Sequence, residues 1–250
     1  MKRLACQVML WLALAHAGVA GAGVLAGATR VIFDDAQVER SLMLANTNPY
    51  PVVVQTWVDR GEGAPDGAST PFIVLPAVFR LQPGGIQGLR IMYTRDALPQ
   101  DRESVFWLNL YEIPPAATGA QARQPRVEMA MNTQLKIFYR PAGLARGNAP
   151  AAPSPRFCAR QQAGEWQLVS RNDTPYHVSF TTLAVAGAGV TRPVQQEPDM
   201  MLAPFGERAY RLGDTRPPAN AAVQYTYVDD AGFPVDGTAR LDQCAAGAAG

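Results

Sequence analysis

Short apolar runs separated by turn residues recur along most of the chain. They occupy residues 41–45, 52–58, 89–93 and 105–110 in the first half, and residues 166–169, 177–180, 208–212 and 223–228 in the second. Each run has about the length of a β-strand, and Gly, Pro, Asn and Asp gather between the runs. Many short strands at such spacing are typical of β-sandwiches. The pattern predicts an all-β fold of two sandwiches.

A stretch with little to bury separates the two halves. Residues 140–155 hold four prolines and two glycines, a composition that is typical of linkers. We therefore predict a first domain over residues 23–144, a linker over residues 145–154 and a second domain over residues 155–250.

The longest alternating segment covers residues 126–139. Alternation predicts a strand whose apolar face carries Val127, Met129, Met131, Leu135, Ile137 and Tyr139. The opposite face carries Arg126, Glu128, Asn132, Gln134 and Lys136. Such a strand would span roughly 46 Å, whereas an ordinary strand has about five or six residues. Two interpretations stay open: a long core strand, or an apolar edge held open for a partner strand.

Composition excludes two classes of protein. With 48% hydrophobic residues the chain can bury cores, so it is not a disordered protein. Charged residues make up only 17%, and a net charge of +1 offers no basic surface for phosphate groups. We therefore expect no nucleic-acid partner.

The first 22 residues have the layout of a secretory signal peptide. Two basic residues precede an apolar run over residues 8–15, and residues 20–22 offer a small-residue cleavage site. Cleavage after Ala22 would export a mature chain that begins at Gly23. An uncleaved membrane anchor is the alternative, but the apolar run falls short of the roughly 20 residues that a span requires.

The mature chain would keep a single histidine, His177. One imidazole excludes metal sites that need two histidines and weakens every triad with a histidine base. The residues around His177 predict a strand start after a turn, so we interpret this histidine as structural. The sequence contains no GxSxG or Walker pattern. We expect no catalytic residues, no metal site and no cofactor.

Cys158 and Cys244 are the cysteines that remain after cleavage. An even count in an exported chain favours a disulfide between them. Two free thiols or redox chemistry are the alternatives, and no CxxC spacing supports the redox interpretation.

Lys136 is the only lysine of the mature chain, among nineteen arginines. It lies where the alternating segment runs into aromatic residues. A lysine head is a compact point charge on a flexible stem, which suits a carboxylate at the end of an apolar surface. A Schiff-base nucleophile is the enzymatic alternative, but no phosphate-binding or acid–base residues accompany this lysine.

Several motifs carry a resemblance to a known family. In the first half they are residues 29–33 (TRVIF), 70–76 (TPFIVLP), 80–84 (RLQPG), 98–109 (LPQDRESVFWLN), 112–115 (EIPP) and 136–141 (KIFYRP). The second half adds residues 172–176 (NDTPY), 201–205 (MLAPF) and 229–232 (DDAG). Together these motifs resemble the periplasmic chaperones of the bacterial chaperone–usher pathway, the PapD-like family, from residue 24 to about residue 242.

The resemblance implies two immunoglobulin-like β-sandwich domains set as an L. It implies a periplasmic chaperone that captures pilus subunits, lends each subunit the strand that its own sandwich lacks, and delivers it to an outer-membrane usher. The donor strand would contain Val127, Met129 and Met131. Relatives usually carry bulkier aliphatic residues where the two methionines stand. Self-association of the free chaperone is left open.

The same resemblance implies roles for charged residues. Arg30 and Lys136 would hold the terminal carboxylate of the subunit and so fix the register of the added strand. Glu103, Arg140 and Asp230 resemble the interdomain ion network of the family, which would set the angle between the domains.

Two other function classes fit the sequence less well. A structural or adhesive pilus component with immunoglobulin-like domains should carry its own N-terminal donor extension, and residues 23–28 are too short and too rich in Gly and Ala for that. A secreted hydrolase would need a general base, and His177 is isolated in the sequence.

Overall fold

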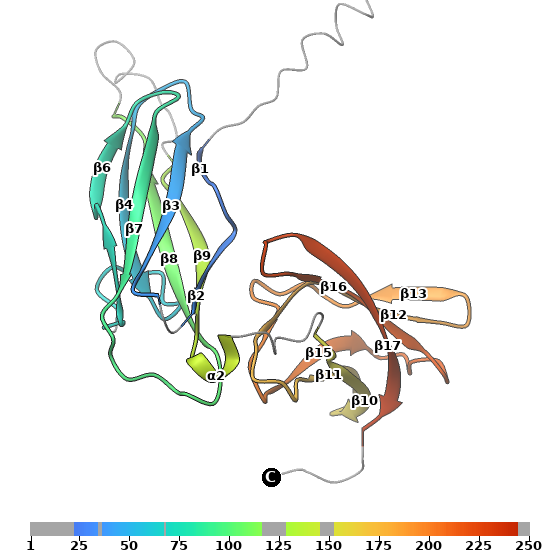
Figure 1. The fold of residues 1–250 in the computed structure, drawn as a ribbon. Helices are drawn as coiled ribbons and strands as arrows, with labels where there is room; N and C mark the ends of the chain where they lie inside the picture. Colours follow the sequence, from blue (N-terminus) through green and yellow to red (C-terminus); the bar gives the residue numbers. More distant parts are fainter. Residues whose placement is uncertain (1–22, 35–36, 68, 117–128, 146–152, 245–250) are drawn as a thin grey trace, which may run out of the picture.

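The computed structural model describes residues 23–34, 37–67, 69–116, 129–145 and 153–244. These residues form two units of β-strands set at an angle to each other, with a four-residue helix, α2 (Ala142–Ala145), at the end of the first unit (Figure 1). The predicted all-β, two-unit fold with an L-shaped arrangement is confirmed. The predicted signal peptide, residues 1–22, lies outside the described residues. Within the described residues, no helix is long and apolar enough to cross a membrane.

The first unit is a sandwich of two sheets. Its strands are β1 (Val24–Ala26), β2 (Arg30–Asp34), β3 (Glu39–Asn46), β4 (Val52–Asp59), β5 (Phe72–Leu75), β6 (Val78–Leu81), β7 (Ile86–Tyr93), β8 (Ser104–Ile113) and β9 (Met131–Arg140). One sheet has the order β1-β3-β7-β5 and the other β2-β9-β8-β4-β6. Phe72 of the first sheet packs its ring 5.0 Å from that of Phe33 and 5.2 Å from that of Phe106, both of the second. Burial of these facing apolar rows holds the sheets together.

The N-terminal strand changes sheets, and this leaves part of β9 uncovered. β1 pairs with β3, whereas β2 runs parallel to β9 with Arg30 opposite Lys136 and Asp34 opposite Arg140. On its other side, β9 pairs with β8 along its length. Within the described part of the chain, no strand pairs with residues 131–135 of β9 on the side where β2 would continue. We call residues 131–135 the free edge.

β9 begins later than the sequence pattern predicts. The expected strand covers residues 126–139, but β9 starts at Met131, and Met129 precedes it in an irregular conformation. The ladder stops here because β8 ends at Ile113 and the next two residues are prolines, which have no N–H to donate. Val127 lies outside the described residues.

The second unit is built around a sheet that folds over on itself. Its strands are β10 (Arg156–Gln162), β11 (Glu165–Arg171), β12 (Val178–Gly187), β13 (Val190–Pro193), β14 (Met201–Leu202), β15 (Glu207–Gly213), β16 (Ala222–Val228) and β17 (Pro234–Gln243). The order is β13-β12-β16-β17-β10-β11-β15, and β14 pairs with β12. β17 pairs first with β16 and then with β10, so one strand joins the two faces. Phe157, Phe180 and Tyr225 pack together inside.

A disulfide ties the first and last strands of the second unit. Cys158 lies in β10, and Cys244 directly follows β17. Their Cα atoms are 4.9 Å apart, and the two sulfurs are bonded. The Cys244 N–H also donates to the carbonyl of Ala159 at 3.1 Å. The predicted disulfide is confirmed.

A buried carboxylate holds the start of β1. Glu112 is only 8% exposed, and its Oε2 accepts a hydrogen bond from the Val24 N–H at 2.8 Å while its Oε1 accepts one from Asn48 at 2.6 Å. The carbonyl of Gly23 accepts from both the N–H and the hydroxyl of Thr47. Bonds to a carboxylate are charge-assisted and strong. The chain is therefore fixed in place from Gly23 onward.

We expect the mature protein to begin at Gly23. Cleavage after Ala22 would leave every one of these hydrogen bonds in place while removing the apolar leader. The intact mass of protein purified from the periplasm should match residues 23–250. A mass that retains residues 1–22 would contradict export, whereas a shift of a few residues would only move the cleavage site.

Candidate functional site

Exposed methionines accompany the free edge. Met131 is 50% exposed and Met129 is 71% exposed, whereas Leu135 and Ile137, which continue the same alternating row, are buried. The apolar row of β9 thus begins in the core and ends at the surface. An unpaired sheet edge beside large exposed apolar side chains is a surface that a strand of another chain can complete.

A polar network holds the opposite face of the free edge. Asn132 and Gln134 both donate to the Asn109 side-chain oxygen at 2.9 Å. Asn109 in turn donates to Asp59 at 2.8 Å, and both of these residues are buried. Because its polar side chains are tied to β8 and β4, the free edge is held extended, with its methionine on the other face.

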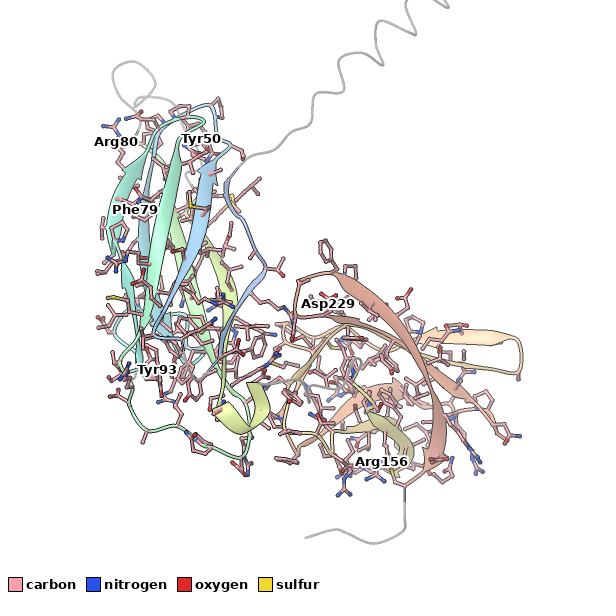
Figure 2. The ribbon with its side chains drawn as sticks, viewed as in Figure 1. Tyr50, Phe79, Arg80, Tyr93, Arg156 and Asp229 are labelled. Carbon is pink, nitrogen blue, oxygen red and sulfur yellow. A yellow bond between two sulfur atoms is a disulfide. The ribbon has the colours of Figure 1, made fainter. Side chains whose placement is uncertain are left out.

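Arg30 lies at the point where the free edge begins. Its guanidinium donates through Nη1 to the carbonyl of Val228 in the second unit at 2.9 Å and lies 5.6 Å from the ring centre of Phe138. Asp229, which follows Val228, lies on the side of the second unit that faces the first (Figure 2). Burial lowers the pKa of Arg30 below its ordinary value, against the raising effect of nearby carboxylates, but an arginine stays charged. Among the described residues, its buried Nε has no hydrogen-bond partner.

Lys136 stands next to Arg30 across the β2–β9 ladder. Its side chain is 23% exposed, and its Nζ contacts Asp199 Oδ1 of the second unit at 3.3 Å. The structure therefore brings together the two cations that the sequence analysis singled out. Two neighbouring cations can bind a carboxylate at the end of the free edge.

The three predicted interdomain residues also come together. Arg140 donates to Glu103 at 2.7 Å and to Asp230 at 2.6 Å, so it links the two units. The Glu103 side chain is 1% exposed, whereas that of Asp230 is 57% exposed. Burial alone would lower the pKa of Arg140, but the hydrogen bonds and charges of its two carboxylates outweigh it and raise that pKa. The hydrogen bonds from Arg140 lower the pKa of Asp230.

Two further residues, His177 and Tyr176, belong to this contact, and the sequence pattern does not indicate either of them. The N–H and Nδ1 of His177 both lie 2.8 Å from Glu103 Oε2. The ring of Tyr176 lies under the Arg140 guanidinium at 5.3 Å. His177 directly precedes β12, as its sequence context predicts. Its partner in the other unit is not visible in that context.

Within the described ranges, no group of three or more His, Cys, Asp and Glu side chains is arranged to hold a metal ion.

Two family models match the chain. The N-terminal domain of the PapD pili and flagellar-assembly chaperones matches residues 23–145. The C-terminal domain of the pili assembly chaperone PapD matches residues 157–239.

Known proteins of similar sequence and structure are fimbrial chaperones. The chain is 34% identical over 226 residues to the probable fimbrial chaperone YadV of Escherichia coli K12, which covers 88% of this chain and 90% of the relative. The crystal structure of the YadV chaperone matches with a TM-score of 0.70 and 32% identity, over 87% of this chain and 99% of that one. The structure of the Salmonella enterica SafA pilin in complex with the SafB chaperone matches with a TM-score of 0.66 over 90% and 99% of the two chains. At 22% identity, this last likeness shows the shared fold.

Proposed function

We infer that this chain, which belongs to the PapD-like family of pilus-assembly chaperones, captures its clients by lending them strand β9. It is a periplasmic, non-enzymatic fimbrial chaperone of the chaperone–usher pathway and binds pilin subunits. A chaperone of the same fold, SafB, forms a complex with the SafA pilin. The observation that carries the proposed mechanism is the free edge, which ends beside Arg30 and Lys136.

Strand lending uses the backbone of the free edge first. The unpaired side of residues 131–135 offers N–H and C=O groups to a subunit strand, which would extend the sheet of each partner. Met131 and Met129 would then leave water and fill apolar positions of the subunit, and we propose the same role for Val127. Methionine adapts its shape easily, so these contacts would add affinity with modest shape selection.

A carboxylate anchor would set the register of the added strand. We propose that Arg30 and Lys136 bind the terminal carboxylate of the subunit, because they are neighbours in the ladder at one end of the free edge. A strand can slip by two residues and still present the same face, so an added strand needs a fixed end. A charge-assisted contact at one end supplies it.

We propose that the interdomain contact keeps both halves of this site in place. Glu103 and Arg140 belong to the first unit and Asp230 to the second, which supports the proposal that their ion pairs set the angle between the units. The domain and linker boundaries that we propose are residues 23–144, 145–154 and 155–250.

We also propose that captured subunits pass to an outer-membrane usher.

An uncovered sheet edge is prone to pair with other chains. Self-association of the free chaperone through residues 131–135 is therefore the competing use of the same edge.

Replacement of one donor methionine should weaken capture gradually. Met131→Ala is expected to lower the affinity for the subunit by about tenfold. The complex loses about 1–2 kcal/mol of binding free energy from the burial of one apolar side chain, while the backbone pairing remains. The measurement is co-purification and titration with a pilin subunit co-produced in the periplasm. Met43→Ala is the matched control, since Met43 is 52% exposed on β3 of the other sheet. Equal losses in the two variants, or no loss in Met131→Ala, would contradict a donor role for β9.

A further inference from the structure

The lysine of the proposed anchor already has a carboxylate partner inside the chain. Lys136 Nζ lies 3.3 Å from Asp199 Oδ1, and Asp199 belongs to the segment between β13 and β14 of the second unit. Arg30, its neighbour, has no carboxylate within ion-pair distance among the described residues. One of the two cations is therefore occupied in the free chaperone, and the other keeps an unsatisfied buried donor.

Asp199 is held independently of Lys136. Its Oδ1 also accepts from the N–H of Met201 at 3.1 Å, which fixes the turn before β14. Its Oδ2 lies 3.7 Å from Nη1 of Arg208, a residue that pairs with Glu197 at 2.6 Å. If Lys136 turned away, Asp199 would keep both a hydrogen bond and a neighbouring cation.

We propose that Asp199 is an internal stand-in for the terminal carboxylate of the client. In the free chaperone, Asp199 pairs with the ammonium group of Lys136. When a client binds, its terminal carboxylate displaces Asp199 and pairs with both Lys136 and Arg30. Asp199 then remains paired with Arg208 and Met201. This proposal rests on the carboxylate anchor of the proposed function and adds the group that the client must displace.

The exposure of Asp199 keeps the free-energy cost of this exchange small. The Asp199 side chain is 47% exposed and that of Lys136 is 23% exposed. An ion pair whose carboxylate stays open to water contributes about 0.2–1 kcal/mol, which corresponds to about 1.5- to fivefold in affinity. Such a contact can keep the Lys136 side chain oriented and shield its charge from small anions in solution. A client can still displace Asp199, because the client also binds through an apolar strand.

The test uses the full mature chain and two synthetic peptides. Both carry the alternating sequence of a pilin C-terminal strand and a fluorescent label. One ends in a free carboxylate and the other in an amide. Asp199→Asn is the informative variant, because asparagine keeps an oxygen that can accept from the Met201 N–H while it loses the charge. Glu197→Gln is the matched control, since it removes one negative charge from the same segment at a residue that pairs with Arg208.

Asp199→Asn should bind the carboxylate peptide about 1.5- to fivefold more tightly than the wild type does. It should bind the amide peptide as tightly as the wild type does. Glu197→Gln should bind both peptides like the wild type. Unchanged or weaker binding of the carboxylate peptide by Asp199→Asn, or an equal gain with the amide peptide or in Glu197→Gln, would overturn the stand-in role. Lys136→Ala separates the two proposals. If Lys136→Ala binds the carboxylate peptide as tightly as the wild type, the anchor itself is wrong; if Lys136→Ala loses binding while Asp199→Asn gains none, only the stand-in is wrong.

Discussion

Lys136→Ala is expected to weaken the binding of a pilin subunit by about 30-fold to several-thousand-fold while the chaperone stays folded. A carboxylate held by Lys136 and Arg30 would be partly removed from water, because the Lys136 side chain is only 23% exposed and Arg30 packs against Phe138. Removal of one cation leaves that anion under-compensated, at a cost of about 2–5 kcal/mol. Arg30→Ala should have an effect of the same order.

Titration of a purified subunit into each variant measures this loss, and circular dichroism shows whether the fold is kept. Arg90→Ala is the charge-matched control, because Arg90 pairs with Glu39 on the surface of the first unit and its side chain is 60% exposed. A subunit that lacks its terminal carboxylate should bind the wild type and Lys136→Ala equally weakly. If the wild type binds this truncated subunit as tightly as the intact one, the carboxylate is not the anchor.

The position of Lys136 could be predicted from the sequence because it depends on local alternation. Two-residue periodicity places Met131 and Leu135 on one face of a strand and Lys136 on the other, and β9 has this arrangement. The same periodicity does not distinguish Met131 from Leu135, although Met131 is 50% exposed and Leu135 is 6% exposed. Coverage of a strand depends on which other strands lie beside it. In this fold, β2 pairs with β9 only from Arg30 onward, so residues 131–135 of β9 have no neighbouring strand on that side among the described residues.

Contacts between the two units could not be predicted from local pattern. The residues around His177 predict a strand start, and they carry no sign that its ring nitrogen meets Glu103, 74 positions away. Asp199 lies 63 positions from Lys136, in a segment without alternation or a motif. Such pairs form only where the two folded units meet, so they depend on the whole fold and not on local sequence. Glu103, Arg140 and Asp230 could be named only because their motifs resemble a family.

Arg140→Ala is expected to destabilise the contact between the units far more than Asp230→Ala, although both changes break an ion pair of the same arginine. Glu103 has a side chain that is 1% exposed, and without Arg140 its buried charge would keep only His177 as a partner among the residues that the structure describes. A buried carboxylate that loses its cation costs about 3–5 kcal/mol. The Asp230 side chain is 57% exposed, and loss of an exposed pair costs at most about 1 kcal/mol.

Urea denaturation and small-angle X-ray scattering of both variants test this difference, since a two-domain chain need not unfold in one step. The buried Glu103 carboxylate can regain contact with water if the two units separate. Arg140→Ala should therefore increase the radius of gyration that scattering measures and lower the urea concentration at the first unfolding midpoint. The Asp230 carboxylate also predicts a pH dependence. Arg140 lowers the pKa of Asp230, so the Asp230 contribution is present at neutral pH and is lost as the pH falls through that lowered pKa. Asp230→Ala should therefore differ slightly from the wild type near neutral pH and converge with it in acid. Equal losses in Arg140→Ala and Asp230→Ala at neutral pH would show that the burial of Glu103 does not decide the strength of the contact.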